Sequence, residues 1–307
     1  MSSHKVKAKR AQGPTEDRKS SNKRAKSTQP IEEFSMSNVV RNVRNAAIEH
    51  AHLPAEIATE LFENEATISY LTADHASWVY HVPRWYRHVF EHAKQEELLA
   101  AWASEEDSHS EASKDEDKEK QFTWSKMFEQ AWDAHPQKYE SIMMFGKMVK
   151  VPRFQMLCGD MGSYRFSGTT YEAHPTFPQA LQHAVQHMKR IVPSPATNDS
   201  RLSGGLVNWY ANGDHYIGPH ADDERDMIAC SPIVALSLGA TRRFVFTKKT
   251  SKSAQVDETA VDRLELQVED GDLLIMGGTA QRTHKHAVPK MARCREPRIS
   301  ITLRCFH

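Results

Sequence analysis

The sequence predicts a mainly β protein in which helices flank a sandwich or barrel. After residue 200, short apolar runs alternate with segments rich in Gly, Pro and Asp, as strands and their turns do. Before residue 200, apolar residues recur at helical spacing in several segments. No apolar run approaches the roughly 20 residues of a membrane helix, and no hydrophobic signal core is present at the N-terminus. We therefore expect a soluble intracellular protein that has no membrane partner.

Net charge and cysteine content exclude few further classes of protein. Lys plus Arg and Asp plus Glu are balanced at 40 each, so net charge does not indicate a partner. The four cysteines have no CxxC spacing, which predicts reduced thiols and gives no zinc-ribbon pattern.

Residues 1–37 are predicted to be a disordered basic tail, because they contain too few apolar side chains to offset the entropy lost on ordering. Lys9-Arg10 and KRAK at 23–26 form a two-part basic cluster. Such a cluster is typical of a nuclear-import signal, although solvated charge on a tail has the same composition. We expect residence in the nucleus, with the cytoplasm as the alternative.

Residues 38–121 are predicted to form a helical N-terminal extension. Apolar residues recur at three- and four-residue spacing over 38–65 and over about 76–103, which predicts helices that face the core. Residues 104–120 are dominated by acids and lysines, so we expect a solvated acidic loop there.

Residues 122–307 are predicted to hold the β core and two further helices. One helix begins near Phe122. In the other, Thr176 is the expected cap, Pro178 suits the first turn and Pro193 ends the helix. The strands are then expected in GLVNWY, IVALSLGA, RRFVFT, RLELQVEDGDLLIM, HKHAVP and RISITLRCF.

The sequence HADDE at 220–224 contains candidate metal ligands. Residues i and i+2 of an extended segment face the same side, so His220 and Asp222 would point at one ion. His284 and His286 share a face of HKHAVP, and either could be a third ligand. Two imidazoles and a carboxylate leave three positions open on an ion, as in non-haem Fe(II) oxygenases. The HxD pattern also occurs by chance in a chain that has 17 histidines.

The run RISITLR places Arg298 and Arg304 on one face of a predicted strand. On a surface strand, both side chains would simply face solvent. If the face lines a barrel interior, both guanidinium groups need anionic partners, because an unpaired buried charge is costly. A small dicarboxylate, together with a metal, would provide those partners.

The ordered combination of N-x-Y at 208–210, HxDDE, SPIVALSLGATRRFVF, H-x-V-P and R-x5-R resembles the AlkB family of Fe(II)/2-oxoglutarate dioxygenases. The resemblance covers roughly residues 122–307. It implies a double-stranded β-helix (jelly-roll) core and the oxidative demethylation of N-alkylated nucleobases, with 1-methyladenine and 3-methylcytosine in DNA as substrates. It also implies Fe(II) as cofactor and 2-oxoglutarate and O2 as cosubstrates.

The resemblance assigns roles by position. The spacing to the H-x-V-P run favours His286 over His284 as the third iron ligand. Arg298, helped by Tyr210, would hold the distal carboxylate of 2-oxoglutarate. The full assignment comprises the iron ligands His220, Asp222 and His286 and the 2-oxoglutarate-binding residues Asn208, Tyr210, Arg298 and Arg304.

The segment MMFGKMVKVPRFQMLCGDMGSYRFSG, at about 143–168, resembles the nucleotide-recognition lid of family members that repair double-stranded DNA. Phe145 would enter the duplex where the damaged nucleotide has left the stack. Arg153 would pair with Glu224 and orient it toward the exocyclic amine of the base. The predicted substrate contacts are Phe145, Arg153, Tyr164, Phe166 and Glu224.

Some features depart from this pattern and leave the strand preference open. Ser300 stands where the family usually has asparagine, and GGTAQRTHKHAVPK and REPR look more like the relative that acts on single strands and RNA. We expect a monomer whose partner is alkylated DNA, duplex or single-stranded, with RNA as a further possibility. The alternative functions are an RNA demethylase or protein hydroxylase of the same superfamily, or a catalytically silent nucleic-acid-binding module.

Overall fold

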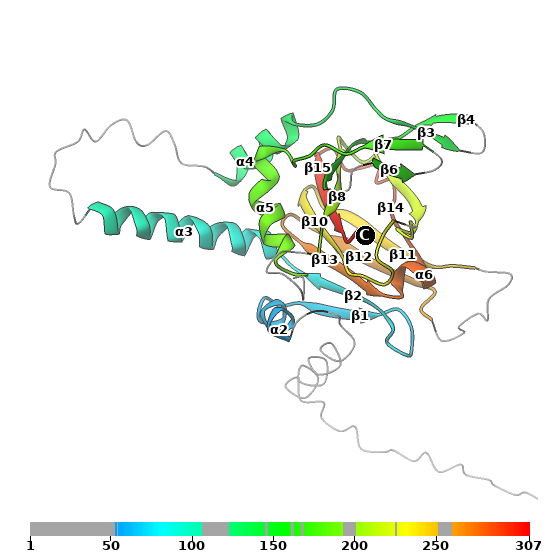
Figure 1. The fold of residues 1–307 in the computed structure, drawn as a ribbon, viewed down its shortest axis with the longest axis horizontal. Helices are drawn as coiled ribbons and strands as arrows, with labels where there is room; N and C mark the ends of the chain where they lie inside the picture. Colours follow the sequence, from blue (N-terminus) through cyan, green and yellow to red (C-terminus); the bar gives the residue numbers. More distant parts are fainter. Residues whose placement is uncertain are drawn as a thin grey trace, which may run out of the picture.

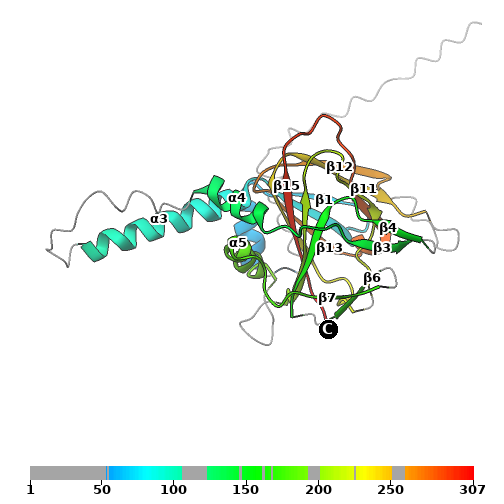
Figure 2. The ribbon, with the colours of Figure 1, turned by 90° about the horizontal axis from the view of Figure 1, so that it is seen from above.

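The computed structural model describes residues 53, 55–105, 123–144, 147–160, 163–166, 169–192, 201–224, 226–250 and 260–307. The predicted basic tail, with its two-part cluster, and residues 106–120 of the predicted acidic loop lie outside the described residues. Figure 1 shows a β body with helices along one side, and α3 (Trp85–Glu105) extends away from this body in both Figure 1 and Figure 2. Among the helices of the described segments, none combines the length and apolar character that crossing a membrane requires.

Two antiparallel sheets form the β body. The larger sheet has the order β1 (Thr67–Tyr70), β2 (Ser77–Val82), β13 (Leu273–Gly278), β10 (Ile233–Gly239), β15 (Arg298–Arg304), β8 (Gly204–Tyr210) and β5 (Phe154–Gly159). The smaller sheet has the order β12 (Arg263–Val268), β11 (Arg242–Lys248), β14 (His284–Val288) and β9 (Ile217–His220). Two facing antiparallel sheets with helices outside them confirm the predicted jelly-roll class with flanking helices.

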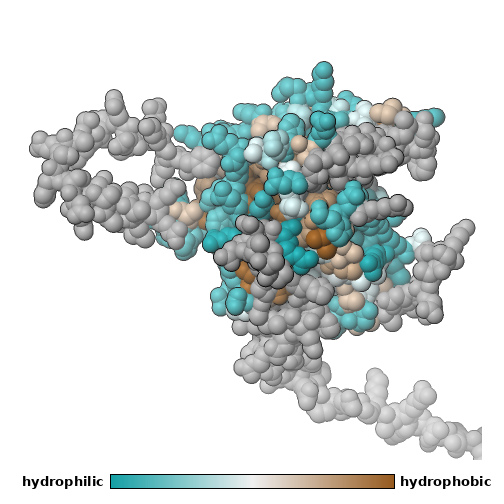
Figure 3. Space-filling model, in the orientation of Figure 1, coloured by the Kyte–Doolittle hydropathy of each residue, from teal (hydrophilic) through white to brown (hydrophobic). Residues whose placement is uncertain are grey.

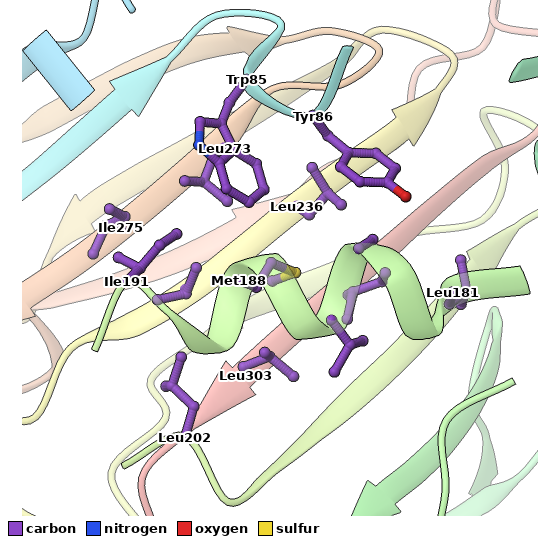
Figure 4. Packing of buried hydrophobic residues seen from close by; sticks show 14 of the residues in the cluster. Trp85, Tyr86, Leu181, Met188, Ile191, Leu202, Leu236, Leu273, Ile275 and Leu303 are labelled. Atoms are coloured by element: carbon purple, nitrogen blue, oxygen red, sulfur yellow. The ribbon is translucent and has the colours of Figure 1, made fainter. Parts of the chain in front are cut away.

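Two hydrophobic clusters hold these layers together. One cluster lies between the sheets and includes Phe246 of the smaller sheet and Met276 of the larger one. The other lies between the larger sheet and the helices α2 (Ala55–Glu63), α4 (Trp124–Asp133) and α5 (Gln179–Lys189). Figure 4 shows Leu181 and Met188 of α5 beside Leu236 and Leu303 of the sheet. The larger sheet is therefore covered on both faces.

Strand β15 shows why the site forms inside the protein. All seven of its residues are buried. Ile299, Ile301 and Leu303 pack in the cluster on the helix side. Because side chains alternate along a strand, Arg298 and Arg304 face the space between the sheets. The structure thus places both arginines in the interior, as the barrel-lining alternative predicted, rather than in solvent.

The helix predicted to begin near residue 76 is wrong in its first part. Residues 77–82 form β2, which pairs with β13, and α3 begins only at Trp85. Five of the six β2 residues are buried because the strand lies inside the sheet, so no alternation of polar residues marks it in the sequence. Of the helix predicted over 38–65, the structure describes α2.

The predicted cap of α5 is also wrong. The helix begins at Gln179, its N-cap position is Pro178, and no side chain forms a capping hydrogen bond. Proline fixes the backbone dihedral φ at a value that suits the entry to a helix, so it can begin α5 without Thr176. By contrast, α4 is capped by a hydrogen bond from the Lys126 main-chain N–H to the Thr123 hydroxyl.

Three small elements border the β body. The hairpins are β3 (Ser141–Met144) with β4 (Lys147–Lys150), and β6 (Ser163–Phe166) with β7 (Thr169–Glu172). A single helical turn, α6 (Ala280–Thr283), joins β13 to β14. The face shown in Figure 3 is mostly hydrophilic where residues are described, with hydrophobic residues visible near its centre.

Candidate functional site

The structure brings together three side chains that could bind one metal ion. His220 ends β9, Asp222 follows two residues later, and His286 lies opposite His220 in the pairing of β9 with β14. One ligand atom from each residue can be chosen so that all three lie within 4.8 Å of one another. Asp222 Oδ1 is 3.6 Å from His220 Nε2, and Asp222 Oδ2 is 3.8 Å from His286 Nε2. This donor set suits Fe(II) with positions left open for other ligands.

The structure also decides between His284 and His286. The two ring nitrogens of His284 contact the Val261 carbonyl oxygen at 2.8 Å and the Thr283 hydroxyl at 2.9 Å. His284 is therefore held by Thr283 and by the segment that precedes β12, whereas His286 belongs to the triad.

The protonation states of Asp222 and His286 favour metal binding. Burial raises the pKa of Asp222, but the charge of Arg304 and the neighbouring imidazoles outweigh burial and hold it well below its ordinary value. Burial, together with the adjacent His220, lowers the pKa of His286 to about 3. Near neutral pH, Asp222 is thus a carboxylate and His286 is a neutral imidazole, the forms that bind metals.

Arg304 supports the triad from β15. Its Nη2 donates to Asp222 Oδ2 at 2.9 Å, and both side chains are almost fully buried. This charge-assisted bond orients the carboxylate and offsets part of its burial cost. That Arg304 also binds 2-oxoglutarate stays a prediction.

Arg298 has the properties of an anion-binding residue. It is 1% exposed, and its Nη2 donates to the Ser237 hydroxyl at 2.7 Å. Its Nε and Nη1 atoms are buried and have no hydrogen-bond partner, and no described carboxylate forms a salt bridge with it. Burial lowers the pKa of Arg298, an effect that the nearby Tyr210 opposes. A buried guanidinium with two nitrogen donors that lack an acceptor fits a carboxylate of a small organic acid.

Tyr210 and Asn208 lie beside these residues on β8. Arg298 is 5.1 Å from the centre of the Tyr210 ring, and the two residues are paired across β8 and β15. Asn208 lines the same interior cavity as the triad, together with Tyr210, Ser300 and Arg304. Of the four residues predicted to bind 2-oxoglutarate, three therefore line this cavity, and the fourth, Arg298, is paired with Tyr210 on the neighbouring strand.

Arg153 donates hydrogen bonds to two neutral side chains. Its Nε donates to Asn208 Oδ1 at 2.7 Å, and its Nη2 donates to Gln155 Oε1 at 3.1 Å. Asn208 Oδ1 accepts this bond, and Nδ2 is the remaining polar atom of the Asn208 side chain. The pair between Arg153 and Glu224 stays a prediction, although both line one cleft.

That cleft is the candidate substrate pocket. It has a volume of about 340 Å³, and His220 and Asp222 are among its lining residues. Its wall combines apolar residues with charged ones, namely Met156, Leu157, Leu206, Ile217, Arg153, Glu140, Glu172, Glu224 and Arg304. The cleft therefore adjoins the candidate metal ligands and offers both apolar and charged side chains to a bound molecule.

Three of the predicted substrate contacts cannot be placed in this cleft. Phe145 lies outside the described residues, between the strands β3 and β4. Tyr164 and Phe166 belong to β6, of which the structure describes the strand but not these side chains. The roles of these three residues as substrate contacts stay predictions.

Sequence reasoning missed three neutral residues around the site. Ser237 accepts from Arg298, Gln155 accepts from Arg153, and Gln281 accepts from the main chain of Asp222. Gln155 stands two residues after Arg153, so shared strand facing could have indicated it. The other two depend on contacts between distant segments.

Known proteins resemble this chain over most of its β core. The sequence model of the 2OG-Fe(II) oxygenase superfamily matches residues 82–304. The chain is 34% identical over 164 residues to the mouse (Mus musculus) protein "DNA oxidative demethylase ALKBH2", covering 53% of this chain and 65% of that one. It is 35% identical over 156 residues to the bovine (Bos taurus) "Alpha-ketoglutarate-dependent dioxygenase alkB homolog 3", covering 51% and 52%.

The matched segments thus span between about half and two thirds of the length of these relatives. Among solved structures, "The structure of OsALKBH1" matches at 17% identity with a TM-score of 0.37, covering 59% of this chain and 92% of that one.

Proposed function

Because the chain belongs to the 2OG-Fe(II) oxygenase superfamily, we propose that it is an Fe(II)- and 2-oxoglutarate-dependent dioxygenase that demethylates N-alkylated nucleobases in DNA. Its similarity to ALKBH2 and to alkB homolog 3 confirms the resemblance to the AlkB family. The observation that carries the proposal is the convergence of the triad with a buried arginine, Arg298, that has undonated N–H groups.

When bound, Fe(II) and 2-oxoglutarate would supply the oxidising chemistry, in which O2 and 2-oxoglutarate yield succinate and CO2 while the N-methyl carbon of the base is hydroxylated. The hydroxymethyl group then leaves as formaldehyde and restores the base. The protein's contribution is binding, orientation and electrostatics.

The residues of the site have separate tasks in this scheme. His220, Asp222 and His286 would hold the metal, and the charge of Arg304 keeps Asp222 ionised. Arg298 would hold the distal carboxylate of 2-oxoglutarate, so that this end of the cosubstrate is fixed by the protein and not by the metal.

The cleft suits a flat cationic base. Glu224 lines it, and the 1-methyladenine and 3-methylcytosine rings carry positive charge, so the carboxylate favours them electrostatically over unmodified bases. Apolar residues such as Met156 and Leu206 would exclude water around the reacting methyl group. These two lesions are therefore the proposed substrates.

A substrate panel tests the proposal. Oligonucleotides that carry either lesion, as duplex, single strand or RNA, would be incubated with Fe(II), ascorbate and 2-oxoglutarate, and formaldehyde and succinate measured. We expect release from at least one DNA form, and loss of release in Asp222→Ala. Asp226→Ala, which removes an exposed acid from the same region, is the matched control and should retain activity. If no oligonucleotide in the panel releases formaldehyde, the result would instead favour a nucleic-acid-binding module.

The same panel tests whether Phe145 enters the duplex where the damaged nucleotide has left the stack. If this residue occupies the space left by an extruded base, Phe145→Ala should slow repair of duplex DNA more than of single strands, because only the duplex loses stacking on extrusion. An equal loss on both forms would remove Phe145 from that role. Greater turnover on RNA than on DNA would redirect the proposal to RNA demethylation.

A further inference from the structure

Asp222 is held at its main chain as well as at its carboxylate. It lies in the loop after β9 and is not part of a strand. Its main-chain N–H donates to Gln281 Oε1 at 3.0 Å, while Arg304 binds its carboxylate from another direction. The position of this ligand is therefore fixed from two sides.

Gln281 belongs to the segment that carries the other histidine ligand. It lies in the single turn α6, which leads directly into β14, and His286 follows five residues later. The hydrogen bond between Gln281 and Asp222 therefore joins the segment of His220 and Asp222 to the segment of His286. It helps to set the separation of the ligands that come from the two segments.

Two further contacts fix the orientation of Gln281. Its Nε2 lies 3.6 Å from the Met276 sulfur, so the Oε1 atom is the one turned toward Asp222. Lys249 Nζ donates to the Gln281 carbonyl oxygen at 2.7 Å and to Asp223 Oδ2 at 3.0 Å. The same two segments are thus linked twice, by Gln281 and by Lys249.

We propose that Gln281 is a positioning residue for the metal site, which it assembles by holding the Asp222 main chain against the His286 segment. The inference rests on the proposed function, in which the triad binds Fe(II). A metal site loses affinity when its ligands can move, because ordering them on binding then costs free energy. Removing the Gln281 acceptor also leaves the main-chain N–H of Asp222 without its hydrogen-bond partner.

Metal binding without turnover tests the proposal. Co(II) would be titrated anaerobically into the full-length apo-protein, and its visible absorption would report both affinity and ligand geometry. We expect Gln281→Leu to raise the Co(II) dissociation constant about tenfold or more and to change the absorption spectrum. Gln281→Glu keeps an acceptor oxygen at the same distance, so its dissociation constant should stay within about threefold of the wild type.

Controls separate positioning from stability. Gln267→Leu makes the same substitution at an exposed position of β12 and should leave Co(II) binding unchanged. Thermal unfolding of each apo-protein shows whether the variant is folded. If Gln281→Leu does not fold, Gln281→Asn, whose acceptor falls short by one methylene, takes its place with the same expected direction.

The possible failures are distinguishable. If the wild type does not bind Co(II), the proposed function itself fails. If the wild type binds and Gln281→Leu binds equally well with the same spectrum, Gln281 does not position the site. A lower unfolding temperature with unchanged Co(II) affinity would likewise overturn the inference, since it assigns Gln281 to stability alone.

Discussion

Replacing Arg298 by methionine should weaken 2-oxoglutarate binding without weakening the fold. The Arg298 guanidinium has two buried N–H positions without acceptors and one bond to Ser237. Two charge-assisted hydrogen bonds to a carboxylate contribute about 1.5–3 kcal/mol each, so their loss should raise the dissociation constant by roughly two to four orders of magnitude. In the ligand-free protein, the same change removes a buried charge that no carboxylate compensates, so the free energy of unfolding should stay equal or increase.

Calorimetric titration of 2-oxoglutarate into the Mn(II)-loaded protein measures the first effect, and urea denaturation of the apo-protein measures the second. Arg298→Lys keeps the charge but loses the planar fork and should fall between the wild type and Arg298→Met. Arg243→Met, at a partly exposed position of β11, is the matched control and should bind normally. A dissociation constant for Arg298→Met within about threefold of the wild type would refute the assignment.

Three further predictions concern the fold. Burial raises the pKa of Asp272, but hydrogen bonds, first from His81, outweigh it and hold the pKa below its ordinary value. The stability that this carboxylate contributes is present above about pH 4 and is lost as pH falls further. In urea titrations, the free energy of unfolding of Asp272→Asn should therefore be about 1–3 kcal/mol lower than that of the wild type at pH 7. Below about pH 4 it should decline less steeply with pH than that of the wild type. A Cβ atom at Gly277 would overlap the Trp78 indole on β2, so Gly277→Ala should lower the thermal unfolding temperature; an unchanged value would show that the indole can move. Burial raises the pKa of the Cys158 thiol to about 12, so a thiol reagent at pH 8 should modify the two partly exposed cysteines first and Cys158 only on unfolding.

The site could be predicted from the sequence where chemistry and spacing coincide. HxD predicts two ligands close together in the chain, and in the structure His220 ends β9 and Asp222 lies in the loop after it. R-x5-R places two arginines on one face of a strand. The third ligand is harder to predict from the sequence, because His284 and His286 are chemically identical and two residues apart. The structure distinguishes them by the register of β14 against β9, which pairs His286 with His220.

The fold was harder to predict where burial is complete. In β2, polar and apolar residues do not alternate, because the strand lies between β1 and β13 and is covered on both faces. The same apolar residues also match helical spacing over a short window, so periodicity alone could not separate the two structures. Residues 77–82 form a strand because they pair with β13, which is far away in the sequence. The sequence of residues 77–82 itself does not indicate that pairing.

Arg298 and Arg304 show how far residue type can go in assigning a site. In the sequence they are equivalent: the same side chain, on the same face of one strand, with the same need for an anion when buried. In the structure, Arg304 donates to Asp222, whereas Arg298 donates to the neutral hydroxyl of Ser237 and lies beside Tyr210. The carboxylate of Asp222 comes from a loop whose position depends on Gln281, so the partner of Arg304 is set by tertiary contacts. An organic dicarboxylate is therefore expected at Arg298, because its buried guanidinium has two nitrogen donors, Nε and Nη1, without a hydrogen-bond acceptor.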